Sequence, residues 1–207
     1  MTETEARKQA ENQGESMRAA VAGDLAEKKP KDDGEKLRLM FVGKIAAGKT
    51  SLCQRLNHEE LTYRKTQTVQ VLAKDINMID TPGEYLERRM FRGPLMVTAM
   101  NADLILLVQS ALDEQTMFPP QFTTMFPKPC IGIVTKIDKA EKRNIEIAEK
   151  YLEYAGVETS FRVSNVTEEG IPELYRYLEA FEEKLWTAAG EASEKKVGNE
   201  AESTQEI

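Results

Sequence analysis

Residues 43–51 read GKIAAGKTS and directly follow the apolar run LRLMFV at 37–42. An apolar run, a turn bracketed by Gly43 and Gly48, and a helix start predict a buried strand, a tight loop and a helix in that order. The glycines allow backbone angles at which successive N–H groups of the loop surround phosphate oxygens. A helix beginning near Lys49 adds the positive end of its dipole. We interpret the stretch as a phosphate-binding loop (P-loop).

The side chains of this loop fit a nucleoside triphosphate and a divalent ion. Lys49 supplies a positive charge for the terminal phosphates, and the Thr50 hydroxyl is placed to bind Mg²⁺. We expect the rest of the loop to line the phosphates, largely through its backbone. These residues are Gly43, Lys44, Ile45, Ala46, Ala47, Gly48 and Ser51.

Strand and helix patterns alternate along the rest of the chain. The continuous apolar runs at 103–109 and 130–135 are typical of strands buried on both faces of a parallel sheet. Shorter strands are expected at 68–73, 75–79 and 159–163, and helices at 49–57, 141–155 and 172–186. The alternation predicts an α/β fold with a doubly wound, mostly parallel sheet and helices on both faces.

Two segments are expected to interrupt this regular alternation. Residues 84–100 contain Gly93-Pro94, so we expect any helix there to be broken. Residues 113–129 hold four prolines and leave room for a short helix at most.

Polar motifs follow the predicted strands where ligands bind in such sheets, at the carboxyl ends. After the third strand come Asp80 and, three residues on, Gly83. An acidic residue in this position is a candidate partner of Mg²⁺, and the Gly83 N–H is a candidate donor to the terminal phosphate.

The strand at 130–135 ends in TKID, residues 135–138, which has the form of the guanine-reading motif NKxD with threonine in place of asparagine. Asp138 is expected to accept hydrogen bonds from the ring N1–H and exocyclic amine of guanine, a pair that adenine lacks. Lys136 is expected to lay its aliphatic stem over the base, and Thr135 completes the motif. After the last strand, Ser164 and Asn165 are expected to bring a short backbone segment against the base.

Two further residues are candidates for the hydrolytic step. Thr66 or Thr68 is expected to close on Mg²⁺ and the third phosphate from a mobile loop, and we favour Thr66. Glu84 stands directly after Gly83, where many GTPases have a glutamine that orients the attacking water. A carboxylate beside a triphosphate is repelled, so we expect slow hydrolysis, with Lys49, Thr66 and Glu84 as the catalytic set.

With these motifs in order, the chain resembles the translation-factor-like branch of P-loop GTPases, which have a Ras-like architecture. The stretches KTQTV at 65–69 and NMIDTPGEYLE at 77–87 are similar to the small GTPase-like proteins of bacterial ethanolamine- and propanediol-utilisation clusters, which are associated with microcompartments. The similarity covers about residues 37–186. It implies GTP or GDP as ligand, Mg²⁺ as cofactor and a cytoplasmic or microcompartment location.

Both ends of the chain are departures from that family. Residues 1–35 carry six basic and nine acidic side chains, and residues 189–207 carry two and five, so the tails hold most of the net charge of −7. We divide the chain into an N-terminal extension (1–36), a nucleotide-binding domain (37–188) and a disordered acidic tail (189–207). The extension is expected either to be disordered or to form a helix that docks on a microcompartment shell or cargo protein.

Composition excludes several other classes. The core lacks the basic face of a nucleic-acid-binding protein, and no apolar stretch is long enough for a membrane span or a signal peptide. Cys53 and Cys130 are expected to be small buried side chains in a reducing compartment.

Two alternatives to a slow GTPase remain. One is an ATP-dependent kinase of a small carboxylate such as acetate, against which TKID argues. The other is a nucleotide-binding scaffold without significant turnover.

Overall fold

The computed structural model describes residues 36–58, 61, 70–73, 77–83, 86 and 92–202. All of them belong to the second of the two units into which the chain divides, Lys36–Ile207. The predicted docking helix of the N-terminal extension therefore lies outside the described residues.

The described strands form one six-stranded sheet in the order β2-β3-β1-β4-β5-β6. Five of them run parallel, and β2 pairs antiparallel with β3, as a hairpin partner would. This order places β1 at the centre, where the chain reverses its direction of winding. The strands are β1 (Arg38–Gly43), β2 (Gln70–Ala73), β3 (Asn77–Asp80), β4 (Leu104–Ser110), β5 (Cys130–Thr135) and β6 (Ser160–Arg162).

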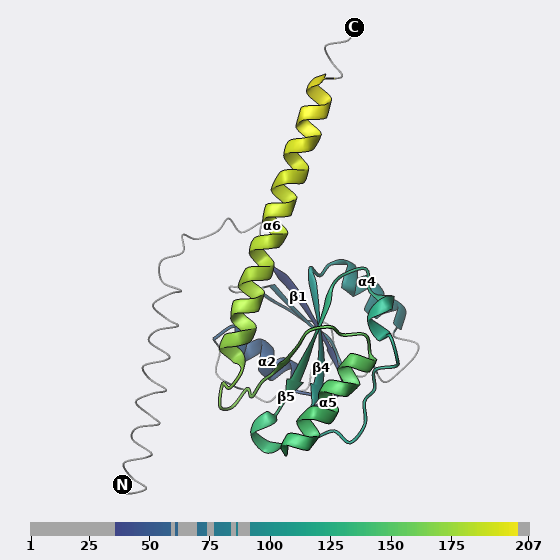
Figure 1. The fold of residues 1–207 in the computed structure, drawn as a ribbon, viewed down its shortest axis with the longest axis vertical. Helices are drawn as coiled ribbons and strands as arrows, with labels where there is room; N and C mark the ends of the chain where they lie inside the picture. Colours follow the sequence, from purple (N-terminus) through teal and green to yellow (C-terminus); the bar gives the residue numbers. More distant parts are fainter. Residues whose placement is uncertain are drawn as a thin grey trace, which may run out of the picture. The chain divides into compact units, whose positions relative to one another are not determined.

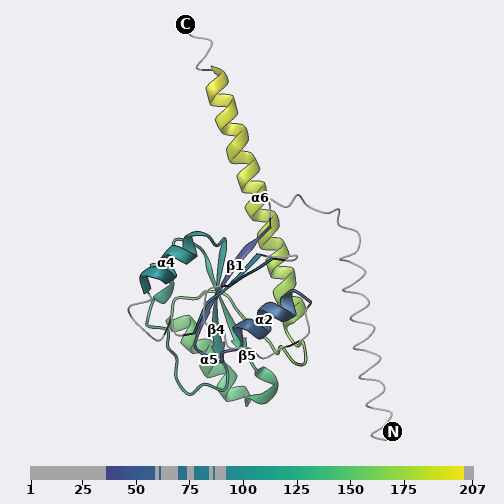
Figure 2. The ribbon, with the colours of Figure 1, turned by 180° about the vertical axis from the view of Figure 1, so that it is seen from behind.

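Helices cover both faces of the sheet (Figure 1). On one face, α2 (Lys49–Leu56) and α6 (Ile171–Glu202) pack on the odd-numbered side chains of β1, such as Leu39 and Phe41. On the other face, α4 (Arg92–Met100) and α5 (Lys142–Tyr154) pack on Met40 and Val42. The view from behind shows the same two layers with the sheet between them (Figure 2). The predicted doubly wound α/β fold is confirmed.

The central strand β4 shows why its sequence is apolar throughout. All seven residues of LILLVQS are buried, because even and odd positions face different helix layers. Its start is fixed by Asp103, which accepts hydrogen bonds from the guanidinium of Arg38 at 2.9 and 2.7 Å. Burial raises the pKa of Asp103, but these hydrogen bonds and the charge of Arg38 outweigh burial and leave the pKa below its usual value.

Two helices differ from their predictions. Gly93-Pro94 does not interrupt a helix but lies in the first turn of α4, where proline is tolerated because its missing N–H would have no partner within the helix. Helix α6 continues to Glu202, through most of the segment that we predicted to be disordered from residue 189. That segment contains no proline and is rich in alanine, glutamate and lysine, which are strong helix formers.

The segment before β5 and the two cysteines are close to their predictions. The proline-rich segment before β5 contains a single short helix, η2 (Phe122–Met125), as predicted. Cys53 is buried, whereas Cys130 at the start of β5 is only partly buried. Burial nevertheless raises the pKa of the Cys130 thiol to about 12, so this thiol is protonated at neutral pH.

Replacing Leu107 of β4 by alanine tests the buried layer. The side chain is fully buried between β4 and the α4–α5 layer, so Leu107→Ala is expected to cost about 2–5 kcal/mol of unfolding free energy. Leu112→Ala is the matched control, because Leu112 is 46 % exposed. Chemical denaturation of both variants measures the difference, and equal losses would contradict the burial of Leu107 in this layer.

Candidate functional site

The loop between β1 and α2 has the backbone shape expected for binding phosphate. Ala46 and Gly48 have φ angles of 60° and 97°, and the other loop residues of this turn do not have positive φ. Gly43, at the end of β1, lies against β4, and a Cβ on it would come within 2.4 Å of the carbonyl oxygen of Val108. Both predicted glycines are therefore required, Gly48 by its conformation and Gly43 by close packing.

Lys49 is 6 % exposed and begins α2. Its ammonium donates hydrogen bonds to the carbonyl oxygens of Gly43 (2.8 Å) and Lys44 (3.0 Å), so the charge lies over the start of the loop. The second lysine of the motif, Lys44, forms an ion pair with Asp113 at 3.3 Å, and its side chain is 43 % exposed.

Thr50 and Asp80 meet at the carboxyl end of β3. The Thr50 hydroxyl donates a 2.6 Å hydrogen bond to Oδ2 of Asp80, which is fully buried. A hydroxyl and a carboxylate oxygen are ligands that suit Mg²⁺. The described residues include no group of three His, Cys, Asp or Glu side chains that could hold a metal ion. An ion here needs most of its ligands from nucleotide and water, as Mg²⁺ usually has.

Gly83 brings the segment after β3 against the loop. A Cβ at Gly83 would lie 2.3 Å from the backbone nitrogen of Ile45, so only glycine permits this approach. The segment is fixed to β1 through Thr81, whose hydroxyl donates to the carbonyl oxygen of Phe41 at 2.5 Å. The structure thus brings Asp80 and Gly83 to the loop, and their roles toward Mg²⁺ and phosphate stay predictions.

Three side chains from the ends of β5 and β6 hold successive carbonyl oxygens of the loop. Lys136 donates to Ala46 at 2.7 Å, Thr135 to Ala47 at 2.6 Å, and Asn165 to Gly48 at 3.2 Å. We term these three side chains the carbonyl clamp. Three loop carbonyls are thus fixed by donors from other strand ends, and a fixed backbone of this kind is what a phosphate-binding loop needs.

Asp138 lies beside this clamp in the short helix η3 (Ile137–Lys139), which directly follows β5. Its Oδ1 accepts a 2.7 Å hydrogen bond from the Ser164 hydroxyl, while the residue as a whole is exposed. One oxygen is therefore oriented by the protein, and the exposed carboxylate is available to a ligand. The two segments that the sequence assigned to base binding, 135–138 after β5 and 164–165 after β6, lie next to each other.

Other predicted residues are placed less fully. Ser51 lies in the first turn of α2 and is partly buried. Thr66, Thr68 and Glu84 lie outside the described residues. Sequence analysis missed Arg55, which donates to the Asn165 backbone from α2 at 2.7 and 2.9 Å. An arginine near the end of a short helix carries no motif, so no local signal identifies it.

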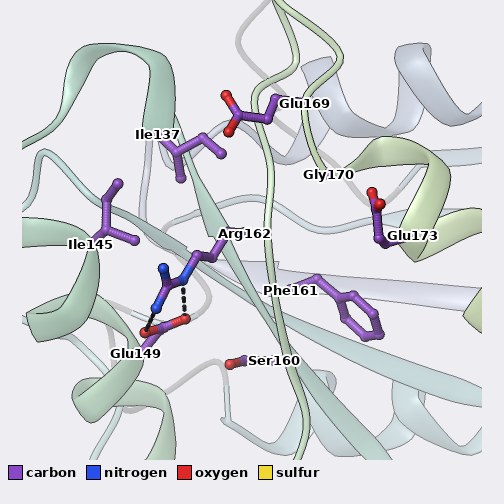
Figure 3. A pocket seen from close by; sticks show the side chains of 9 residues that line it. All are labelled: Ile137, Ile145, Glu149, Ser160, Phe161, Arg162, Glu169, Gly170 and Glu173. Carbon is purple, nitrogen blue, oxygen red and sulfur yellow. Dashed lines mark hydrogen bonds and ion pairs between the residues drawn. The ribbon is translucent and has the colours of Figure 1, made fainter. Parts of the chain in front are cut away.

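A separate surface depression of about 500 Å³ lies along β6, between α5 and the start of α6. Arg162 points to Glu149 of α5, with which it forms two hydrogen bonds, and its neighbour Phe161 points the other way (Figure 3). Ile137 is the only residue of the predicted TKID motif among its lining residues. The depression is open to solvent, and none of the clamp residues lines it.

The sheet order, the glycine-bracketed loop and the motifs at the strand ends define a P-loop GTPase-like domain. Solved P-loop GTPases share this fold. A bacterial selenocysteine-specific elongation factor, EF-Sec, aligns with a TM-score of 0.58 at 21 % identity, over 72 % of this chain but 29 % of that protein. Era from Aquifex aeolicus, bound to GDP·AlF₄⁻, aligns with a TM-score of 0.51 at 19 % identity, over 70 % of this chain and 56 % of Era.

The chain belongs to the PduV-EutP family, described as ethanolamine utilisation–propanediol utilisation, whose model matches residues 36–180. The propanediol utilization protein PduV of Citrobacter freundii is 39 % identical over 150 residues, covering 72 % of this chain and 98 % of that protein. A protein named probable acetate kinase EutP, from Escherichia coli K12, is 29 % identical over 142 residues, covering 68 % and 88 %. The predicted resemblance is confirmed. In the described part of the chain, no helix has the length and apolarity needed to cross a membrane.

Replacing Gly83 by alanine tests the contact between the segment after β3 and the loop. The added methyl group collides with the Ile45 backbone, so Gly83→Ala is expected to lower stability by about 1–3 kcal/mol. The melting temperature should fall by several degrees. Gly93→Ala is the control, since nothing lies within 4 Å of a Cβ there, and it should leave the melting temperature nearly unchanged. An unchanged melting temperature for Gly83→Ala would contradict the close approach of the two backbones.

Proposed function

We propose that this protein binds GTP with Mg²⁺, hydrolyses it slowly and serves ethanolamine or propanediol utilisation. The observation that carries the proposal is the position of Asp138, oriented by Ser164 at the carboxyl end of β5 and next to the phosphate loop. A carboxylate can accept hydrogen bonds from N1–H and the exocyclic amine of guanine. Adenine offers no such pair and would leave the carboxylate unpaired.

The phosphate end of the proposed site consists of residues that already meet. The N–H groups of the loop and the Lys49 ammonium bind the phosphates, and Thr50 with Asp80 holds Mg²⁺, directly or through water. The ion, when bound, neutralises charge on the phosphate oxygens. On binding, Lys49 exchanges the carbonyl oxygens of Gly43 and Lys44 for phosphate oxygens as partners. In this proposal the backbone N–H groups of the loop and the N-terminus of α2 bind the same anion.

Turnover in this proposal is slow. Glu84 replaces the expected water-orienting glutamine, and Thr66 supplies the hydroxyl that closes on the third phosphate. Intrinsic hydrolysis by a GTPase without a partner arginine is of order 10⁻⁴ per second, and we propose a rate in that range. Loss of the third phosphate then releases the segments around Thr66 and after Gly83.

The family suggests where the activity is used. The matched relatives are named for propanediol utilisation or as probable acetate kinases, and the family description covers both utilisation routes. We propose a cytoplasmic protein associated with bacterial microcompartments, with residues 1–36 as the segment that contacts shell or cargo. The proposal includes neither a nucleic acid nor a membrane as a partner.

A carboxylate kinase is a second candidate, because the EutP relatives carry the name probable acetate kinase. The same loop would then bind ATP, and the terminal phosphoryl group of ATP would be transferred to acetate, giving acetyl phosphate and ADP. Asp138 argues against adenine as the base. A scaffold that binds nucleotide without turnover is the third candidate.

Base choice is tested by Asp138→Asn. The amide no longer accepts from both donors of guanine, so affinity for GTP should fall about ten- to a hundredfold, and xanthosine triphosphate should become the better ligand. Calorimetric titration of both nucleotides measures this. Glu141→Gln, an exposed carboxylate three residues further on, should change neither affinity. Equal affinities of the wild-type protein for GTP and ATP would contradict the base assignment.

Product analysis separates the three candidates. With GTP, ATP and acetate present, the wild-type protein should release free phosphate from GTP and form no acetyl phosphate. Lys49→Ala should abolish binding while the protein stays folded, because it removes the ammonium at the phosphate end of the loop. Acetyl phosphate formed from ATP would establish the kinase, and binding without any product would establish the scaffold.

A further inference from the structure

We propose that Arg55 and Asn165 are positioning residues that couple the base end of the nucleotide site to the phosphate loop. Neither residue needs to touch the nucleotide through its side chain. Together they hold the loop at residues 164–169 against α2, so that Asp138 and the phosphate loop keep one relative position. The inference rests on the proposed function, because it concerns the same nucleotide site.

Asn165 forms the first link. The residue is only 8 % exposed, and its Nδ2 donates to the carbonyl oxygen of Gly48 at 3.2 Å. Gly48 is the left-handed residue that precedes α2, so its carbonyl direction fixes how the loop enters the helix. The acceptor there is a carbonyl oxygen, and this determines which end of the amide faces it.

Arg55 forms the second link, from the last turn of α2. Its Nε and Nη2 both donate to the backbone oxygen of Asn165, at 2.9 and 2.7 Å, and its Nη1 donates to Glu168 at 2.8 Å. The side chain is 22 % exposed, so these bonds are partly shielded from water. Its planar fork allows all three bonds at once, which a lysine ammonium cannot reproduce in the same geometry.

The held loop also orients the base-reading carboxylate. Ser164 donates its hydroxyl to Asp138 and accepts the backbone N–H groups of Val166 (3.3 Å) and Thr167 (3.1 Å). Glu168, the partner of Arg55, has a φ of 63°, a conformation that costs a non-glycine residue energy and persists only when surrounding contacts enforce it. A continuous set of bonds therefore runs from Arg55 through the loop to Asp138.

The threonine at position 135 reaches only one of two neighbouring loop carbonyls. A threonine hydroxyl carries a single proton, and here that proton is directed at Ala47. The next carbonyl, of Gly48, accepts the Leu52 N–H of α2 at 2.9 Å and also the amide of Asn165 from the neighbouring strand end. The 164–169 loop thus adds a hydrogen bond to the phosphate loop, and Arg55 holds the 164–169 loop in place.

Arg55→Lys is the direct test, since it keeps the charge and removes the fork. Release of a fluorescent GDP should become about tenfold faster. The ratio of affinities for GTP over inosine triphosphate, which lacks the exocyclic amine, should shrink because Asp138 is less firmly placed. Asn165→Ala should act in the same direction. Arg162→Lys breaks a comparable two-bond pair with Glu149 at the sheet edge and should change neither quantity.

Hydrogen exchange supplies a measurement that needs no nucleotide. In Arg55→Lys the amides of Val166 and Thr167 should exchange faster, while those of β4 stay unchanged. If exchange is faster in Arg55→Lys but the wild-type protein binds no guanine nucleotide, the coupling of loop and helix is supported and the proposed function is overturned. Unchanged exchange, or an unchanged GTP-to-inosine-triphosphate ratio with only a lower melting temperature, would overturn the positioning role.

Discussion

The outward-facing carbonyls of the phosphate loop are the constraint on which the site depends. A loop that turns its N–H groups toward an anion must turn its carbonyls away from it, and a buried carbonyl without a donor costs free energy. Here Lys136, Thr135 and Asn165 supply donors to three successive carbonyls. These donors come from the ends of β5 and β6, so the loop is held in part by segments far from it in sequence.

The sheet is what makes this convergence possible. In parallel strands all carboxyl ends meet at one edge, and β1, β3, β4 and β5 are parallel neighbours. One apolar layer on each face of the sheet keeps these ends in register, because the central strands are buried on both sides. Packing energy therefore fixes the positions of polar groups that contribute little to stability themselves.

Sequence reasoning was most successful where function and fold share a local pattern. The glycines of the loop, the acidic end of β3 and the TKID motif could be placed because each lies within a few residues of an apolar strand. The Gly93-Pro94 pair was misread, because local propensity does not distinguish a break inside a helix from the first turn of one. The extent of α6 was missed because the prediction gave more weight to the acidic composition of residues 189–202 than to their helix propensity.

Contacts between distant residues could not be predicted in this way. Arg55 and Asn165 are 110 positions apart, and nothing near either residue indicates the other. Thr135 illustrates the consequence. It departs from NKxD, and in the structure its hydroxyl donates to the carbonyl of Ala47, while an amide donor to the loop comes from Asn165. A substitution within a motif is therefore judged by the donors and acceptors that converge on the same backbone groups, because the loop requires those hydrogen bonds and not a particular residue to make them.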